Sequence, residues 1–151
     1  DSDCFLRKDE SMFLLEFCNV PTTGAGLGTF PLWFVSTSSG NFLTISQEKI
    51  SKNTWVNLTA TWDEKARDND PNRGKIYINA GLTTSVVVTP NNGYGPIIPG
   101  SMGAHGGGFV IGKYSTETFN GDVAQVLIYN RALSAAEVSQ NFNANRSRFG
   151  I

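Results

Sequence analysis

The stretch FNGDVAQVLIYNRALSAAEVSQNF, Phe119–Phe142, changes its hydrophobic pattern halfway along its length. The first half alternates apolar and polar residues with a period of two, which predicts a β-strand over Val123–Tyr129. In the second half Ser134 precedes Glu137 with the spacing of a capping box. In that motif the serine hydroxyl accepts a hydrogen bond from the glutamate amide, and the carboxylate accepts one from the serine amide. A helix is therefore predicted to begin at Ser134.

The predicted helix is short and has one apolar stripe. Ala135, Val138 and Phe142 share that stripe, and Leu133, just before the cap, is placed to act as a hydrophobic staple. A helix of this length is marginal on its own, so it must dock on the rest of the protein. Because exposed strands invite aggregation, we expect the helix to cover an open end or edge of the sheets.

The remaining sequence is rich in β-strand signals. Short segments of β-branched and aromatic residues alternate with connections built from Gly, Pro, Asn, Asp and Ser, which favour turns. The predicted strands are Met12–Phe17, Leu32–Thr37, Phe42–Ser46, Trp55–Trp62, Lys75–Asn79, Thr84–Val88, Gly108–Ile111 and Val123–Tyr129. Regular strand spacing without intervening helices predicts an all-β fold, an antiparallel jelly-roll β-sandwich with a short C-terminal helix, rather than a parallel α/β sheet.

The segment Trp55–Trp62 shows the period-two pattern most clearly. The face that we expect to point to the core carries Val56, Leu58, Ala60 and Trp62. Trp33, Trp55 and Trp62 all fall within predicted strands, and we expect all three to be core residues.

Length and charge exclude several classes of protein. A chain of 151 residues suits a single domain, residues 1–151. Charged residues make up 17%, the formal net charge is -1, and Lys and Arg are scattered, so no basic face is available for nucleic acid. No apolar run reaches the roughly 20 residues that a membrane span needs, so membrane insertion is not expected. Because the chain begins at Asp1 rather than Met, we expect it to be the C-terminal part of a longer chain.

The cysteines and the single histidine give little sign of a metal site. Cys4 and Cys18 fit either a local disulfide or two buried thiols. His105 lies in a Gly-rich segment far from both in sequence, so we expect a loop residue there and no zinc site.

Three segments together resemble a known family. They are WVNLTATWD (Trp55–Asp63), KIYIN (Lys75–Asn79) and the run from Phe119 to Val138. In this order they resemble the signature of laminin-G-like domains in the concanavalin A-like lectin/glucanase superfamily, which implies a jelly-roll sandwich. One departure is Ala80, because the family usually has Gly directly after the Asn, and this indicates a slightly different turn. An F-D-G-x-x-D-Y stretch that is common near the start of such domains is also missing.

The end of the sequence suggests a context. Asn141–Ile151 is similar to the last residues of laminin-G-like domains in tailed-phage structural proteins. This similarity implies a virion, or else an extracellular or cell-surface location, and membership of an oligomeric assembly. Bacterial surface proteins have closely similar endings, so a secreted carbohydrate-binding module, appended to a glycoside hydrolase or a surface adhesin, is the alternative.

Enzymatic activity is not expected. The glucanase branch of the superfamily presents its carboxylates in an E-x-D-x-x-E arrangement, and retaining hydrolysis needs two carboxyl groups about 5–5.5 Å apart. The sequence has no such arrangement: Glu10 and Glu16 are out of register, Glu48 stands alone, and Asp63 and Glu64 are adjacent.

One loop has the composition of a calcium site. Asp68, Asp70 and Asn72 alternate oxygen-bearing side chains as calcium loops do, which makes calcium the one cofactor that the sequence suggests. The spacing does not fit an EF-hand, which would need Gly at Arg73 and Glu at Asn79. The same residues are also ordinary in a solvated loop between two strands.

A glycan site is predicted in the loops. Sugar rings pack on aromatic faces while their hydroxyls need directional partners. The candidate carbohydrate-binding residues are Asn91, Asn92, Tyr94 and Tyr114, with the first three in the long Gly-rich segment Asn91–Gly108. Loop aromatics are equally suited to contact a neighbouring subunit. The sequence therefore predicts a non-catalytic structural or adhesive module of a phage virion whose partners are glycans or other surface proteins.

Overall fold

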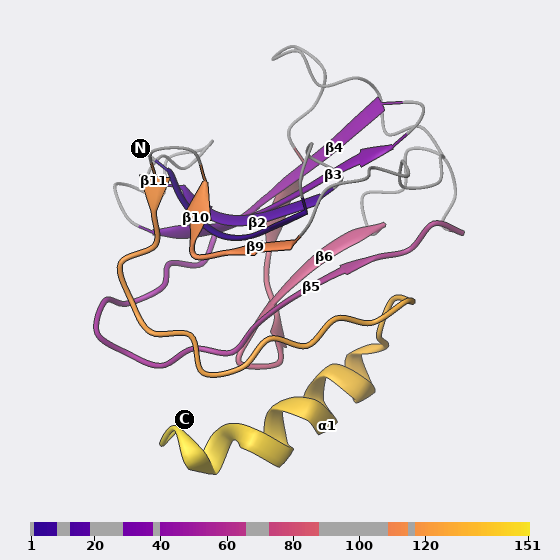
Figure 1. Ribbon diagram of the computed structural model, residues 1–151. Helices are drawn as coiled ribbons and strands as arrows, with labels where there is room; N and C mark the ends of the chain where they lie inside the picture. The colour runs from indigo at the N-terminus through magenta and orange to yellow at the C-terminus, as the bar shows by residue number, and fades with distance from the viewer. Residues whose placement is uncertain are drawn as a thin grey trace.

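The described part of the chain is built from antiparallel sheets and one C-terminal helix (Figure 1). The computed structural model describes residues 2–8, 13–18, 29–37, 40–65, 73–87, 109–114 and 117–151. The larger sheet has six strands in the order β8-β4-β3-β2-β1-β9, and the smaller one has three in the order β5-β6-β7. Their bounds are β1 Ser2–Lys8, β2 Phe13–Cys18, β3 Phe30–Thr37, β4 Gly40–Ser46, β5 Leu58–Trp62, β6 Gly74–Ile78, β7 Gly81–Leu82, β8 Ser85–Val87 and β9 Phe109–Ile111. A separate two-stranded ribbon pairs β10 (Lys113–Tyr114) with β11 (Glu117–Thr118).

The two main sheets stack on a shared apolar core, which confirms the predicted β-sandwich. The larger sheet contributes Phe13, Leu15, Trp33, Val35 and Phe42, and the smaller sheet contributes Trp62 and Ile76. Aromatic rings pack within and between the sheets. The ring centroids of Phe13 and Trp33, both in the larger sheet, are 5.6 Å apart, and those of Phe42 and Trp62, one from each sheet, are 5.1 Å apart. Burial of each such side chain is worth about 1.5–3 kcal/mol, so this layer holds the sheets together.

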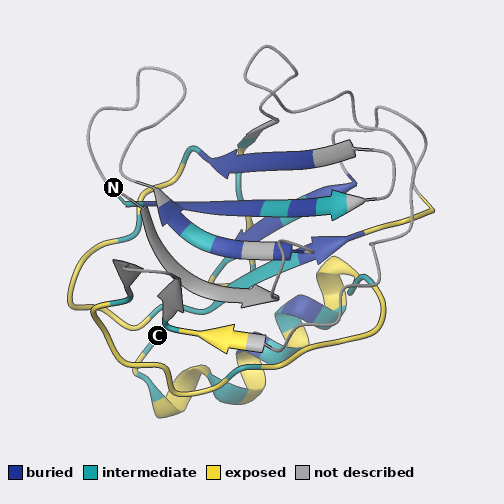
Figure 2. Ribbon diagram, turned by 45° about the horizontal axis from the view of Figure 1, so that its top comes forward, coloured by how far each residue is buried: buried dark blue, intermediate teal, exposed yellow. Residues whose placement is uncertain are grey.

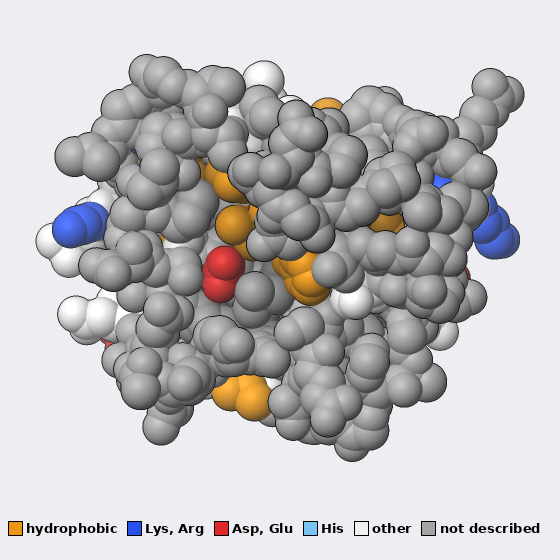
Figure 3. Space-filling view, turned by 90° about the horizontal axis from the view of Figure 1, so that it is seen from above, with side chains coloured by type: hydrophobic (Ala, Val, Ile, Leu, Met, Phe, Trp, Pro, Cys, Tyr) orange, Lys and Arg blue, Asp and Glu red, His pale blue; other side chains and the backbone are white. Residues whose placement is uncertain are grey.

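The larger sheet is apolar on its other face as well. A second cluster there contains Phe30, Leu32, Leu43 and Ile45, with Phe34 packed against it. Figure 3 views the molecule from this side, and hydrophobic side chains are visible among the atoms that are not described. Burial on both faces explains why β3 reads FPLWFV without polar alternation. Figure 2 accordingly shows its central strands largely as buried.

The C-terminal helix α1 (Ala135–Asn145) begins as predicted and is followed by the short 3-10 helix η3 (Arg146–Arg148). Ser134 is the N-cap, and both hydrogen bonds of the capping box to Glu137 are present. Val138 and Phe142 are buried, whereas Ala135 is exposed, so the predicted apolar stripe is wrong at its first position.

The helix lies beneath the smaller sheet, on the side away from the larger one (Figure 1). Two residues on this outer face of the smaller sheet are buried, Thr61 at 7% exposure and Tyr77 at 3%. Burial of the Tyr77 hydroxyl raises its pKa. The prediction that the helix covers an end or edge is therefore wrong in detail, because α1 lies along a face of the smaller sheet.

Two other predictions about strands are wrong. Val123–Tyr129 runs as an extended segment without strand pairing between β11 and α1. Val126 packs against the core, but Leu127, Ile128 and Tyr129 are exposed. The period-two alternation that predicted a strand breaks down over residues 126–129, where four apolar residues are consecutive, so one face of a strand could not bury them all. In addition, no strand was predicted before Met12, because the sequence SDCFLRK contains only a short apolar stretch; in the structure it forms β1, which pairs with β2 on one side and β9 on the other.

Segment 55–62 is shorter as a strand than its pattern predicted. β5 begins at Leu58, and Leu58 and Ala60 pack with Trp62 on the core, as predicted. Trp55 lies before the strand and is 42% exposed, so the prediction that it is a core residue is wrong. Trp33 and Trp62 are buried, as predicted.

Candidate functional site

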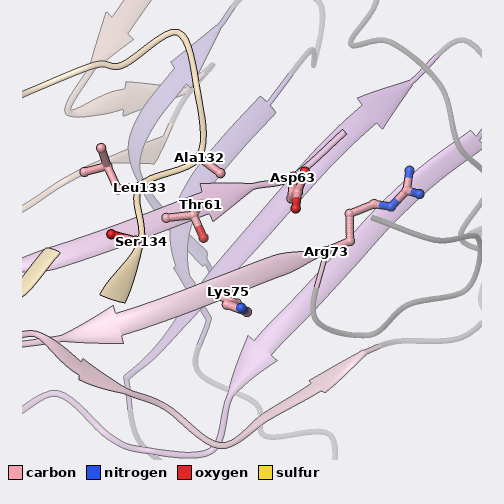
Figure 4. Close-up of a pocket in the computed structure, with 7 residues that line it drawn as sticks. All are labelled: Thr61, Asp63, Arg73, Lys75, Ala132, Leu133 and Ser134. Carbon is pink, nitrogen blue, oxygen red and sulfur yellow. The ribbon is translucent and has the colours of Figure 1, made fainter. Parts of the chain in front are cut away.

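A polar pocket of about 280 Å³ lies where the smaller sheet meets the start of α1. We call it the β5–β6 pocket. Its lining comes from the end of β5, the start of β6 and the segment before the helix, and consists of Thr61, Asp63, Arg73, Lys75, Ala132, Leu133 and Ser134. Figure 4 shows these side chains.

The β5–β6 pairing sets the positions of the polar side chains. Thr61 lies opposite Lys75 in the antiparallel register, so both side chains point to the outer face of the smaller sheet. Just beyond, the amide of Asp63 donates to the carbonyl of Arg73 at 2.9 Å. This hydrogen bond continues the ladder past the last strand residue, and it fixes the Asp63 backbone at the mouth of the pocket.

The Asp63 carboxylate is held at the start of a turn. Its Oδ1 accepts a hydrogen bond from the Lys65 amide at 2.9 Å, the local bond that aspartate makes in turns. Asp63 is exposed and Lys75 is half-buried, so an acidic and a basic group line one cavity.

Arg73 contributes to the pocket mainly through its backbone. Its side chain is buried, and the guanidinium lies 5.5 Å from the centre of the Trp62 ring. In Figure 4 this side chain points away from the other lining residues. The contact is a cation–π interaction that ties the pocket to the core between the sheets.

The other wall of the pocket is the capped start of α1. The Ser134 hydroxyl lies 2.9 Å from Glu137 Oε2 and accepts from the Glu137 amide at 3.3 Å. Hydrogen bonds from Arg131 and from Ser134 lower the pKa of Glu137 to about 2. A carboxylate that stays ionised over a wide pH range keeps this wall in place.

Another acidic residue, Glu48, has a structural role. One of its carboxylate oxygens accepts from the Thr84 amide at 3.0 Å, and the other lies 3.0 Å from the Ser46 hydroxyl. These bonds join the end of β4 to the segment before β8.

Within the described ranges, no three His, Cys, Asp or Glu side chains are close enough together to hold a metal ion. In the same part of the chain, no helix has the length and apolar character that crossing a membrane requires.

The sequence-predicted sites fall mostly outside the described residues. This is so for the calcium candidates Asp68, Asp70 and Asn72 and for the glycan candidates Asn91, Asn92 and Tyr94. Tyr114 lies in β10, opposite Glu117, and only its backbone is described.

Sequence reasoning did not find the β5–β6 pocket. Thr61, Lys75 and Ser134 are ordinary residues for a strand and a helix cap, and they are far apart in sequence. The available signal was the hairpin register, which places Thr61 opposite Lys75 once both strands are assigned.

Comparison with known families gives one match. The family model for laminin-G-like domains, described as the concanavalin A-like lectin/glucanases superfamily, matches residues 5–139. No curated protein and no solved structure matches the chain.

Proposed function

Since the chain belongs to the concanavalin A-like lectin/glucanases superfamily, we propose that it is a non-catalytic, glycan-binding adhesive module of a phage virion, as a fibre or capsid decoration. The observation that carries the glycan part is the β5–β6 pocket. It combines a carboxylate, an ammonium group and a threonine hydroxyl in one cavity of about 280 Å³. Sugar hydroxyls both donate and accept hydrogen bonds, so they match such a mixed set. Its volume is just below the range usual for small-molecule pockets, which suits a single sugar unit.

The positions of the described carboxylates support binding without hydrolysis. Retaining and inverting glycosidases both need a pair of carboxyl groups that flank the scissile bond. Among the described residues that line the pocket, Asp63 is the one acidic side chain. Glu48 and Glu137 serve in hydrogen bonds that hold the fold. The described lining thus has the chemistry to hold a saccharide, and within it Asp63 has no second carboxyl group beside it for hydrolysis.

The virion part of the proposal rests on the similarity of the ending Asn141–Ile151 to tailed-phage structural proteins. Its test is mass spectrometry of purified virions, in which this chain should be present in stoichiometric amounts. Detection in a bacterial secretome, on a polypeptide that also carries a hydrolase, would favour a carbohydrate-binding module instead.

Glycan binding is tested with an array of diverse glycans and two pocket variants. Asp63→Asn keeps an oxygen for the Lys65 amide but removes the charge, and Lys75→Gln removes the ammonium group. Each should weaken binding by about tenfold, the effect of losing one hydrogen bond to a charged group. Asp122→Asn is the matched control, because this exposed aspartate loses the same charge as Asp63→Asn but does not line the pocket. Equal binding by all three variants would show that the pocket is not the site.

A further inference from the structure

Trp55 is the one tryptophan of the three that is exposed. It ends a tight turn in which Asn53 has a φ of 59° and the Thr54 hydroxyl donates to the Ser51 carbonyl at 2.9 Å. Asparagine tolerates this left-handed conformation better than most residues. A turn held in this way presents the indole ring to solvent with little freedom to collapse, which lowers the entropic cost of binding to it.

The end of the chain folds back and places a second ring beside Trp55. The ring centroids of Trp55 and Phe149 are 5.1 Å apart at an interplanar angle of 47°. Phe149 is fixed by its amide, which donates to the Arg146 carbonyl at 3.0 Å, and Arg146 Nε donates to the Ile151 carbonyl at 2.7 Å. The two rings therefore form an aromatic corner, in which Trp55 is exposed and Phe149 is partly buried.

A positive charge lies next to this corner. The guanidinium of Arg148 is 5.6 Å from the centre of the Phe149 ring, and the residue is exposed. Of the other cations in the neighbouring segments, Lys49 lies over the Phe30 ring instead, 5.8 Å from its centre. Arg148 is thus the cation placed at this corner, and its charge favours an anionic ligand there.

We propose that Trp55, Phe149 and Arg148 form a binding site for an acidic saccharide. An aromatic face packs against the C–H face of a sugar ring, while a guanidinium pairs in a bidentate way with a carboxylate or a sulfate. An acidic saccharide offers both features on one unit. Arg146 does not share this role, because its side chain is turned to Phe142, 5.3 Å from that ring, and to the Ile151 carbonyl. The inference rests on the proposed glycan-binding function, and it assigns the ligand class to a second surface, apart from the β5–β6 pocket.

Tryptophan fluorescence provides the test, since Trp55 is the indole that a ligand can reach. The probes are tetragalacturonate, which carries carboxylates, a chondroitin sulfate tetrasaccharide, which also carries sulfates, and the neutral cellotetraose. We expect both acidic probes to change the fluorescence and to bind at least about tenfold more tightly than the neutral one, with the preference lost at high ionic strength. Preference for one acidic probe over the other identifies the anionic group.

Two variants locate the binding. Arg148→Gln should abolish the preference for the acidic probes, and Trp55→Ala, measured by calorimetry, should reduce binding of all three. Lys65→Gln is the matched control, since it removes one exposed positive charge beyond the opposite end of β5 and should leave binding unchanged. Arg148 is exposed, so its substitution leaves the fold intact even if that of Trp55 does not.

The outcomes separate this inference from the proposed function. Tetragalacturonate binding that is equal in the parent, Arg148→Gln and Trp55→Ala overturns the acidic site. If glycans still bind and Asp63→Asn or Lys75→Gln removes the binding, the proposed function stands and this inference fails. If no glycan binds to any form, both fail.

Discussion

Replacing Gly74 by alanine tests how tightly the two sheets are packed. A Cβ at this position would lie 2.2 Å from Phe42 Cε1 and 2.7 Å from Phe42 Cζ, well inside van der Waals contact. The Phe42 ring is only 2% exposed and rests against Trp62, so it has no free space to move into. Gly74 has a negative φ, so alanine is allowed by the backbone, and the whole effect comes from packing.

The expected cost follows from two opposing effects. Overpacking of a dense core typically destabilises by about 1–3 kcal/mol. Replacing glycine with alanine at a compatible backbone position recovers about 0.4–1 kcal/mol through the unfolded state. We therefore expect a net loss of about 1–2 kcal/mol in the free energy of unfolding, which for a domain of this size lowers Tm by roughly 5 °C.

Urea unfolding of four proteins measures this contact: the parent, Gly74→Ala, Phe42→Leu and the double variant. Leucine at position 42 removes the ring atoms that the new methyl group would meet, so the double variant should be more stable than the sum of the single effects predicts, by about 1 kcal/mol. The control cycle uses Phe13→Leu, a core ring that packs on Trp33 instead. A Gly74→Ala variant as stable as the parent, or additive effects with Phe42→Leu, would refute the packing described for these sheets.

Four further outcomes are expected from unfolding measurements. Ser134→Ala removes the N-cap of α1 and should cost about 1 kcal/mol, and an unchanged Tm would mean that the helix does not depend on this cap. The pKa of Glu137 is lowered in the folded state from 4.5 to about 2, so the ionised carboxylate stabilises the fold fully above pH 4.5 and this stabilisation is lost as the pH falls toward 2. Glu137→Gln should remove this part of the dependence of stability on pH. A variant with the same pH profile as the parent would contradict the role of the carboxylate. Phe142→Ala removes a buried ring of the helix and should cost about 3–5 kcal/mol. Asn143→Ala, at the exposed neighbouring residue, should cost less than about 0.5 kcal/mol. Similar losses for the two variants would contradict the docking of α1 through Phe142. Ala80→Gly should stabilise by about 0.5–1 kcal/mol, because Ala80 has a φ of 64°, and a loss of stability would contradict this backbone strain.

The Ala80 prediction also corrects an expectation from the sequence. The departure from the Asn-Gly of the family indicated a different turn. In the structure Ile78 pairs with Gly81, which leaves a two-residue hairpin loop of Asn79 and Ala80 with φ values of 50° and 64°. These are the signs of a type I′ turn, the turn that Asn-Gly forms. The departure therefore changes the strain in the turn and leaves its type unchanged.

Local signals were sufficient for the elements that depend on few neighbours. The capping box needs only Ser134 and Glu137, and the period-two pattern of β5 needs only the strand residues and one buried face. Local signals failed where a neighbouring strand or segment decides the structure. β1 is a strand because β2 and β9 lie on either side of it, and pairing supplies what its own SDCFLRK lacks.

Trp55 illustrates the same limit with a consequence for function. An indole within a run of β-formers is predicted to be core because burial of so large a ring is favourable. Whether it is buried depends on the chain end, which lies about a hundred residues away in sequence and brings Phe149 against it from one side. That contact covers part of the ring and leaves 42% of the side chain exposed, next to the charge of Arg148. The sequence pattern thus predicts burial of Trp55, whereas its contact with Phe149 holds the ring at the surface. Because the Trp55 ring is fixed, has one open face and lies near the Arg148 cation, it is available to a ligand.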